Sequence, residues 1–165
     1  MALTPAITDL EQLKDKAEVA ALLNWQPAVV SAAKFDRDEL TVWIDRSQLL
    51  PAMQFLRDDP AMKFNLLADV TCLDWFPSEP RFEVVYHLFS ISRKARLRLK
   101  VKLDSSDTRI SSVISLWPSS NFFEREVFDL FGIQFEGHPY MKRIMMPEDW
   151  KGHPLRKDYP VEGYR

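Results

Sequence analysis

The spacing of hydrophobic and polar residues changes several times along this chain, and each change marks a new element. The pattern predicts helices over residues 9–23, 47–57, 110–117 and 122–131. It predicts strands over residues 29–33, 40–44, 67–76, 82–90, 93–103 and 133–135. This order of elements indicates an α+β fold, a single domain with a mostly antiparallel sheet packed by helices on one face.

The clearest alternation lies in the strand predicted between residues 93 and 103. One face of this strand is apolar, with Ala95, Leu97, Leu99, Val101 and Leu103, and the other carries Arg96, Arg98, Lys100 and Lys102. A period of two residues indicates one buried face and one charged face. Four cations in a row are also suited to follow a nucleic-acid backbone. The formal net charge of −2 provides no wider basic field, so a solvated sheet face that protects against aggregation is the favoured interpretation.

From residue 137 onward the sequence shows neither the helical nor the strand periodicity. Residues 137–165 nevertheless contain large apolar side chains such as Tyr140, Met145 and Trp150, which disordered tails generally lack. Four prolines stiffen this stretch and lower the entropy that it would lose on binding a partner. We therefore predict a folded domain over residues 1–136 and an extended, irregular docking tail over residues 137–165.

One carboxylate breaks the amphipathic pattern of the helix predicted at residues 122–131. Glu124 projects into the apolar arc of this helix, whereas Arg125, Glu126 and Asp129 lie on the opposite, polar side. Arg125 and Asp129 are four residues apart and are able to pair across one turn.

A buried carboxylate needs a cation or several hydrogen-bond donors, because an unpaired buried charge is costly. Arg143 and Arg156 are the candidate cations for Glu124. Alternatively, Asn121 begins the helix, and Glu124 is then the third residue of a capping box. The two interpretations are compatible, and both stay open. Gly132 is expected to end the helix in the left-handed conformation.

The composition excludes several kinds of site. Cys72 is the one cysteine, so the chain has neither an internal disulfide nor a CxxC pair, and we expect a buried thiol. His138 and His153 have no further histidine or cysteine at metal-ligand spacing. No secretion signal and no run near the ~20 apolar residues that span a bilayer is present. We expect a water-soluble, cytoplasmic chain.

Four motifs in the last third of the chain closely resemble the signature of one family. They are EREVFDLFGI at residues 124–133, GHP at 137–139, KRIMMPEDW at 142–150 and PLRKDYP at 154–160. Together they resemble the C subunit, or thirty-kilodalton subunit, of the proton-pumping NADH:quinone oxidoreductase, respiratory complex I. The resemblance is nearly continuous from Asn121 to Pro160.

The resemblance implies a non-redox accessory subunit of the hydrophilic arm, in which other subunits bind the iron–sulfur clusters, FMN and quinone. It implies a hetero-oligomer, peripheral on the cytoplasmic face of the bacterial inner membrane, whose tail docks on the large D subunit near subunits B and I. The family gives structural and docking roles to the motif positions Glu124, Arg125, Glu126, Asp129, Gly132, His138, Pro139, Arg143, Pro147, Trp150, Pro154, Leu155, Arg156, Lys157, Asp158 and Tyr159.

Two other classes of function follow from the residues alone. The cations Arg96, Arg98, Lys100 and Lys102 are compatible with a nucleic-acid-binding module, and Glu124 and Glu126 with a free-standing hydrolase. The sequence has no recognisable nucleophile motif and no glycine-rich phosphate loop. We therefore expect no independent catalytic activity and no nucleic-acid partner.

Overall fold

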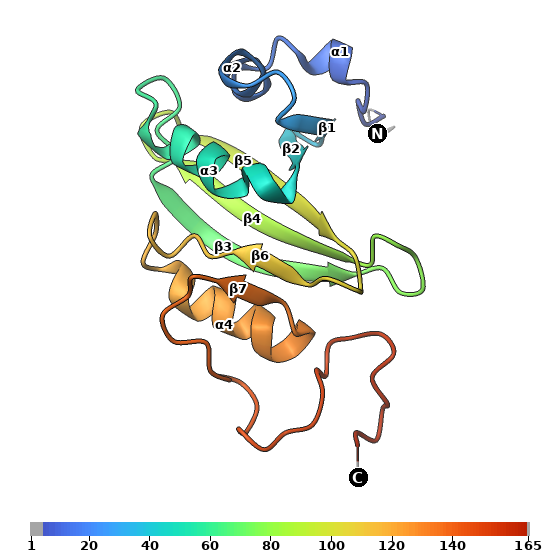
Figure 1. Ribbon diagram of the computed structural model, residues 1–165. Coiled ribbons are helices and arrows are strands. Elements are labelled where there is room, and N and C mark those ends of the chain that lie inside the picture. Colours follow the sequence, from blue (N-terminus) through green and yellow to red (C-terminus); the bar gives the residue numbers. More distant parts are fainter. Residues whose placement is uncertain (1–4, 165) are drawn as a thin grey trace.

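The alternating strand identified from the sequence lies at the centre of a five-stranded sheet. The computed structural model describes residues 5–164 and gives the strand order β1-β2-β5-β4-β3 (Figure 1). The strands are β1 Val30–Asp36, β2 Glu39–Ile44, β3 Leu66–Asp74, β4 Phe82–Ser90 and β5 Ala95–Leu103. Only the β2–β5 pair is parallel among these strands, so the predicted mostly antiparallel sheet is confirmed.

One face of the sheet forms the hydrophobic core of the domain. On β5, Leu97, Leu99, Val101 and Leu103 are at most 2% exposed, which confirms the predicted buried face for these four residues, whereas Ala95 is half-buried. The register places these four residues opposite Leu88, Tyr86, Val84 and Phe82 of β4, respectively. Burial of apolar side chains such as these stabilises the domain, because apolar burial contributes roughly 25 cal/mol per Å².

The helices pack against the same core. They are α1 Leu10–Leu13, α2 Ala17–Trp25, α3 Leu49–Asp58 and α4 Ser120–Phe131, with a 3-10 turn, Arg46–Gln48, before α3. The buried apolar residues of α2, α3 and α4 belong to the apolar cluster that contains the sheet. In Figure 1, α1 and α2 lie near β1, whereas α4 lies near β3 at the other edge.

The single helix predicted over residues 9–23 is wrong, because the chain breaks between α1 and α2. Leu13 and Val19 are both fully buried, but in one straight helix their side chains would point in very different directions. An extended Lys16, with φ −67° and ψ 128°, separates the two helices and turns both side chains inward.

The helix predicted over residues 110–117 is also wrong. Its first residues form β6, Arg109–Ser111, which pairs in parallel with β7, Gln134–Glu136. Beyond β6 the chain makes one turn, in which the amides of Leu116 and Trp117 donate to the carbonyl of Val113. Ile110, Val113 and Trp117 are all buried. Their spacing of three and four residues resembles one face of a helix, but here it results from a short strand followed by a turn.

Residues 137–164 contain no helix or strand, in agreement with the predicted irregular tail. In Figure 1 this segment leaves β7, passes close to α4 and continues to the C-terminal end of the described chain. Among the described residues, no helix combines the length and apolarity needed to cross a membrane.

Candidate docking surface

Asp129 of α4 fixes the first part of the tail. Its Oδ2 accepts hydrogen bonds from the backbone amides of Ile144, Met145 and Met146 at 2.8 to 2.9 Å. Its Oδ1 forms an ion pair with Arg143 Nη1 at 2.5 Å. We call this group of contacts the proximal attachment. The predicted outward position of Asp129 is wrong, because its side chain is fully buried under this loop.

Arg143 extends the proximal attachment along the tail. Its Nη2 donates to the carbonyls of Trp150 and Gly152, at 3.1 and 3.0 Å. One guanidinium therefore joins α4 to the loop on both sides of Pro147, and its planar fork of donors suits this bridging role.

Arg125 also binds the tail and does not pair with Asp129. Its Nε donates to the carbonyl of Lys142 at 3.0 Å, and its Nη2 donates to that of Arg143 at 3.2 Å. The predicted pair across one turn of α4 is replaced by these contacts, because the two side chains reach different parts of the tail.

Glu124 is buried, as predicted, but neither an arginine nor a capping box accounts for its burial. Its Oε2 accepts from the hydroxyl of Ser112 at 2.5 Å, and its Oε1 accepts from the amide of Val113 at 2.8 Å. α4 begins at Ser120 with Ser119 before it, so Glu124 is not the third residue of a capping box. Burial raises the pKa of Glu124, and these hydrogen bonds offset only part of that effect.

Gly132 ends α4 in the left-handed conformation, as predicted, with φ +76°. The end of this helix is covered by the tail. A Cβ at Gly132 would lie 2.5 Å from Arg156 Nη2 and 2.6 Å from the His153 ring. Arg156 Nε donates to the carbonyl of Phe131 at 2.6 Å, and the Leu155 amide donates to that of Leu130 at 3.0 Å. The tail thus satisfies carbonyl groups that the last turn of a helix leaves without partners.

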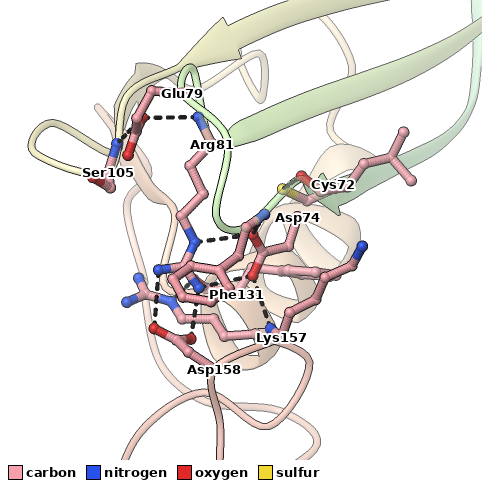
Figure 2. Close-up of polar contacts among 11 residues, drawn as sticks. Cys72, Asp74, Glu79, Arg81, Ser105, Phe131, Lys157 and Asp158 are labelled. Atoms are coloured by element: carbon pink, nitrogen blue, oxygen red, sulfur yellow. Dashed lines mark hydrogen bonds and ion pairs between the residues drawn. The ribbon is translucent and has the colours of Figure 1, made fainter.

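A second group of contacts fixes the end of the tail to the sheet (Figure 2). Asp74, at the end of β3, forms an ion pair with Arg81, and its Oδ2 also accepts from the amide of Lys157 at 2.9 Å. Arg81 in turn pairs with Asp158 at 2.6 Å. We call this group the distal attachment. Figure 2 shows Arg81 between the two carboxylates.

The distal attachment combines a buried pair with an exposed one. Burial alone would raise the pKa of Asp74, but Arg81 and the amides of Lys157 and Phe76 outweigh it and lower that pKa to about 2. The side chain of Asp74 is 2% exposed, whereas that of Asp158 is 43% exposed. The ion pair between Arg81 and Asp158 is therefore the weaker part of the attachment, because solvent screens its charges.

Sequence reasoning missed Asp74 and Arg81. They flank the turn that contains Pro77 and Pro80 and lie about 80 residues before their partners in the tail, with separations of 83 and 77 residues. The sequence signal for these two residues was a pair of opposite charges, with Asp74 at the end of β3 and Arg81 directly before β4. Nothing in the local pattern indicates that the tail returns to this point.

The other predicted docking positions differ in their exposure. Glu126, Pro139, Pro147, Trp150, Leu155, Lys157 and Asp158 are exposed, and His138, Pro154 and Tyr159 are half-buried. Most of the predicted docking positions that are exposed or half-buried thus lie on the tail, next to α4. Large apolar side chains on this segment also face solvent, among them Tyr140, Met145, Trp150, Leu155 and Tyr164.

The cations of β5 are partly neutralised by neighbouring strands. Arg98 pairs with Glu39, and Lys100 pairs with Glu83, which is itself buried. Arg96 lies over the ring of Phe89, with 5.8 Å between its guanidinium carbon and the ring centroid. Cross-strand pairs of opposite charge stabilise a sheet, so this arrangement favours the structural interpretation of the row over nucleic-acid binding.

Two further expectations concern reactive groups. Cys72 is buried, as expected, and burial raises the pKa of its thiol to about 12. Within residues 5–164 no three potential histidine, cysteine or carboxylate ligands are grouped as a metal site requires.

The fold and the attached tail define a class of small α+β domains with an ordered, irregular C-terminal extension. The family described as "Respiratory-chain NADH dehydrogenase, 30 Kd subunit" matches residues 42–165. The chain therefore belongs to this family of thirty-kilodalton subunits.

Known relatives agree with this assignment. The C subunit of the NADH-quinone oxidoreductase from Roseiflexus sp. (strain RS-1) is 48% identical over 134 residues, which is 81% of this chain and 76% of that relative. The relative of the same name from Citrifermentans bemidjiense is 48% identical over 127 residues, 77% of this chain and 78% of that relative.

A solved structure of a trypsin-resistant fragment of Nqo5 is 40% identical, covers 62% of this chain and 82% of that chain, and has a TM-score of 0.57. The chain is accordingly a subunit of a hetero-oligomeric NADH:quinone oxidoreductase complex.

Proposed function

We propose that this chain is a non-redox accessory subunit that scaffolds the quinone-reducing module of a proton-translocating NADH:quinone oxidoreductase. In this proposal the tail docks on the large D subunit, close to subunits B and I. The complex lies on the cytoplasmic face of the bacterial inner membrane, and neighbouring subunits bind the FMN, iron–sulfur clusters and quinone. The purified chain alone is then expected to have no NADH or quinone turnover.

The observation that carries this proposal is the arrangement of the tail. The proximal and distal attachments hold its backbone against the domain, yet Met145, Leu155 and Tyr164 are 51 to 61% exposed. An apolar surface held in one conformation loses little entropy when a partner covers it. Exposed apolar surface of this kind is typical of protein interaction sites.

Limited trypsin digestion tests the docking role of the tail. Lys151 and Lys157 are exposed cleavage sites in the tail. We expect cleavage there in the isolated chain and at least about tenfold slower cleavage in the complex purified from its native membrane, since an interface removes access to the backbone. Equal rates in the two preparations would contradict tail docking.

Affinity purification of the tagged full-length chain from its native membrane tests the identity of the partners. We expect recovery together with a large subunit and a cluster-bearing subunit of the complex. Recovery of the chain without them would contradict the scaffold proposal.

A further inference from the structure

Two stretches far apart in the sequence meet at one carboxylate at the end of β3. Asp74 Oδ1 accepts from the backbone amide of Phe76, and Asp74 Oδ2 accepts from that of Lys157, both at 2.9 Å. The turn that follows β3 and the tail are therefore direct neighbours on the surface of the protein.

Both stretches expose large apolar side chains beside this contact. Trp75 and Phe76 are 50% and 45% exposed, and Leu155, two residues before Lys157, is 51% exposed. Single exposed apolar residues are common on protein surfaces, but neighbouring ones that include tryptophan and phenylalanine are typical of interaction sites. Trp75 and Phe76 lie outside the motifs that identified the family.

Arg81 holds this surface in place. Its guanidinium carbon lies 4.9 Å from the centroid of the Phe76 ring. The same guanidinium pairs with Asp74 on the sheet and with Asp158 on the tail. Phe76 therefore rests on a cation that is fixed from two sides, and little side-chain entropy is left to lose on binding.

We propose that Trp75, Phe76 and Leu155 form one composite docking surface, joined by Arg81, for an apolar pocket on another protein subunit of the complex. This inference rests on the proposed function, because Leu155 belongs to the tail. Family membership places the chain among other subunits, and the surface is continuous with the proposed docking segment.

The test replaces the exposed aromatic side chains in the full-length chain. The double variant Trp75→Ser/Phe76→Ser is compared with Ile91→Ser, which changes a 57% exposed residue in the turn at the opposite end of β4. Tagged variants are expressed in the native host and recovered from the membrane. We expect at least about tenfold less double variant in the complex, because central aromatic side chains carry much of the energy of an interface.

Folding and self-association are controlled separately. The circular dichroism of the purified double variant is expected to match that of Ile91→Ser. Its thermal midpoint is expected to lie only a few degrees lower, because one partly exposed contact between Phe76 and Arg81 is lost. If the double variant enters the complex as well as Ile91→Ser does, the composite surface is overturned. A concentration-dependent dimer of the wild-type chain that the double variant lacks would also overturn it, since the occupant would then be a second copy.

The failure of this inference is distinguishable from failure of the proposed function. If the double variant enters the complex normally and its tail is protected from trypsin there, only the composite surface is overturned. An unprotected tail in the purified complex overturns the docking of the tail, and with it the contribution of Leu155.

Discussion

Glu124 shows how a buried carboxylate is kept without a cation from any residue between 5 and 164. Its two oxygens accept from one hydroxyl and one amide, and its side chain is fully buried. These donors belong to the segment after β6, so the carboxylate joins α4 to the small parallel pair β6–β7. Its pKa is raised by burial, which means that the folded state favours the protonated form.

Replacing Glu124 by glutamine is expected to be mild. The amide keeps an acceptor for Val113 and a polar group for Ser112, so we expect a loss of about 1 kcal/mol or less in unfolding free energy near pH 7. Glu124→Ala leaves both donors unsatisfied in a cavity, and we expect a loss of ~3 kcal/mol. Urea denaturation measures both values, and an equal loss for the two variants would contradict this account.

The pH dependence of the same variant has a defined sign. The ordinary pKa of Glu124 is 4.5, and the folded value is higher. The wild type therefore loses stability as the pH rises from 4.5 through the folded pKa, whereas Glu124→Gln lacks this loss. The unfolding free energy of the wild type is therefore expected to fall relative to that of Glu124→Gln as the pH rises.

Gly132 and Gly137 provide a matched pair for the junction of helix and tail. Both have positive φ, +76° and +83°, but a Cβ at Gly137 meets nothing within 4 Å. Gly137→Ala is expected to lose about 1 kcal/mol through backbone strain alone. Gly132→Ala must also displace Arg156 and His153, so we expect at least about 2 kcal/mol. Denaturation curves measure both losses, and equal losses would mean that the tail contacts at Gly132 contribute nothing.

At the scale of elements, the tail has two attachments of different strength. The proximal attachment surrounds a fully buried carboxylate with four donors, whereas the distal attachment ends in the partly exposed Asp158. Local opening follows burial and contact density. The end of the tail is therefore expected to open while the segment after α4 stays in place.

Trypsin digestion of the isolated chain distinguishes the two attachments. Asp158→Asn is expected to speed cleavage after Arg156 and Lys157 several-fold and to leave cleavage after Lys142 unchanged. Asp129→Asn is expected to speed cleavage after Lys142, because three amides lose their acceptor charge. Asp149→Asn is the control, since Asp149 is exposed and forms no ion pair with any residue between 5 and 164. Identical cleavage patterns for Asp129→Asn and Asp158→Asn would show that the tail opens as one unit.

The elements were predictable where burial follows one simple period. The alternation of β5 matches the expected residues because the apolar core covers one face of this strand, and β4 has the predicted bounds. Residues 110–117 were misassigned because their buried positions depend on β7 and Glu124, which lie later in the chain. The same limit applies to the docking surface. Its tail side was identified by its motifs, whereas Asp74, Trp75, Phe76 and Arg81 join it only through contacts over long separations.

For the whole molecule, acid stability depends on the carboxylates that hold the tail. Burial opposes the ionised form of both Asp74 and Asp129, but their donors lower both pKa values, that of Asp74 from 3.8 to about 2. The resulting stabilisation is present above the unfolded pKa and is lost as the pH falls through the folded pKa. Acidification from pH 3.8 to 2 is therefore expected to weaken the fold and the attachment of its tail together.

Asp74→Asn tests this contribution. The variant is expected to be about 2 kcal/mol less stable than the wild type at pH 7, and the difference should shrink as the pH approaches 2. Urea denaturation between pH 7 and pH 2 measures it. A difference that is independent of pH would show that Asp74 acts through its shape and not through its charge.

The long separation between Asp74 and Lys157 also determines when the docking surface forms. The proximal contacts close loops of only 14 to 17 residues, whereas the contact between Lys157 and Asp74 spans 83 residues. Because the entropy of loop closure rises with length, we expect the distal contact to form after β3 and β4 hold Asp74 and Arg81 in position. A partner that binds both sides of this contact would accept finished chains and pass over incompletely folded ones, so that assembly of the complex would itself check the folding of this subunit.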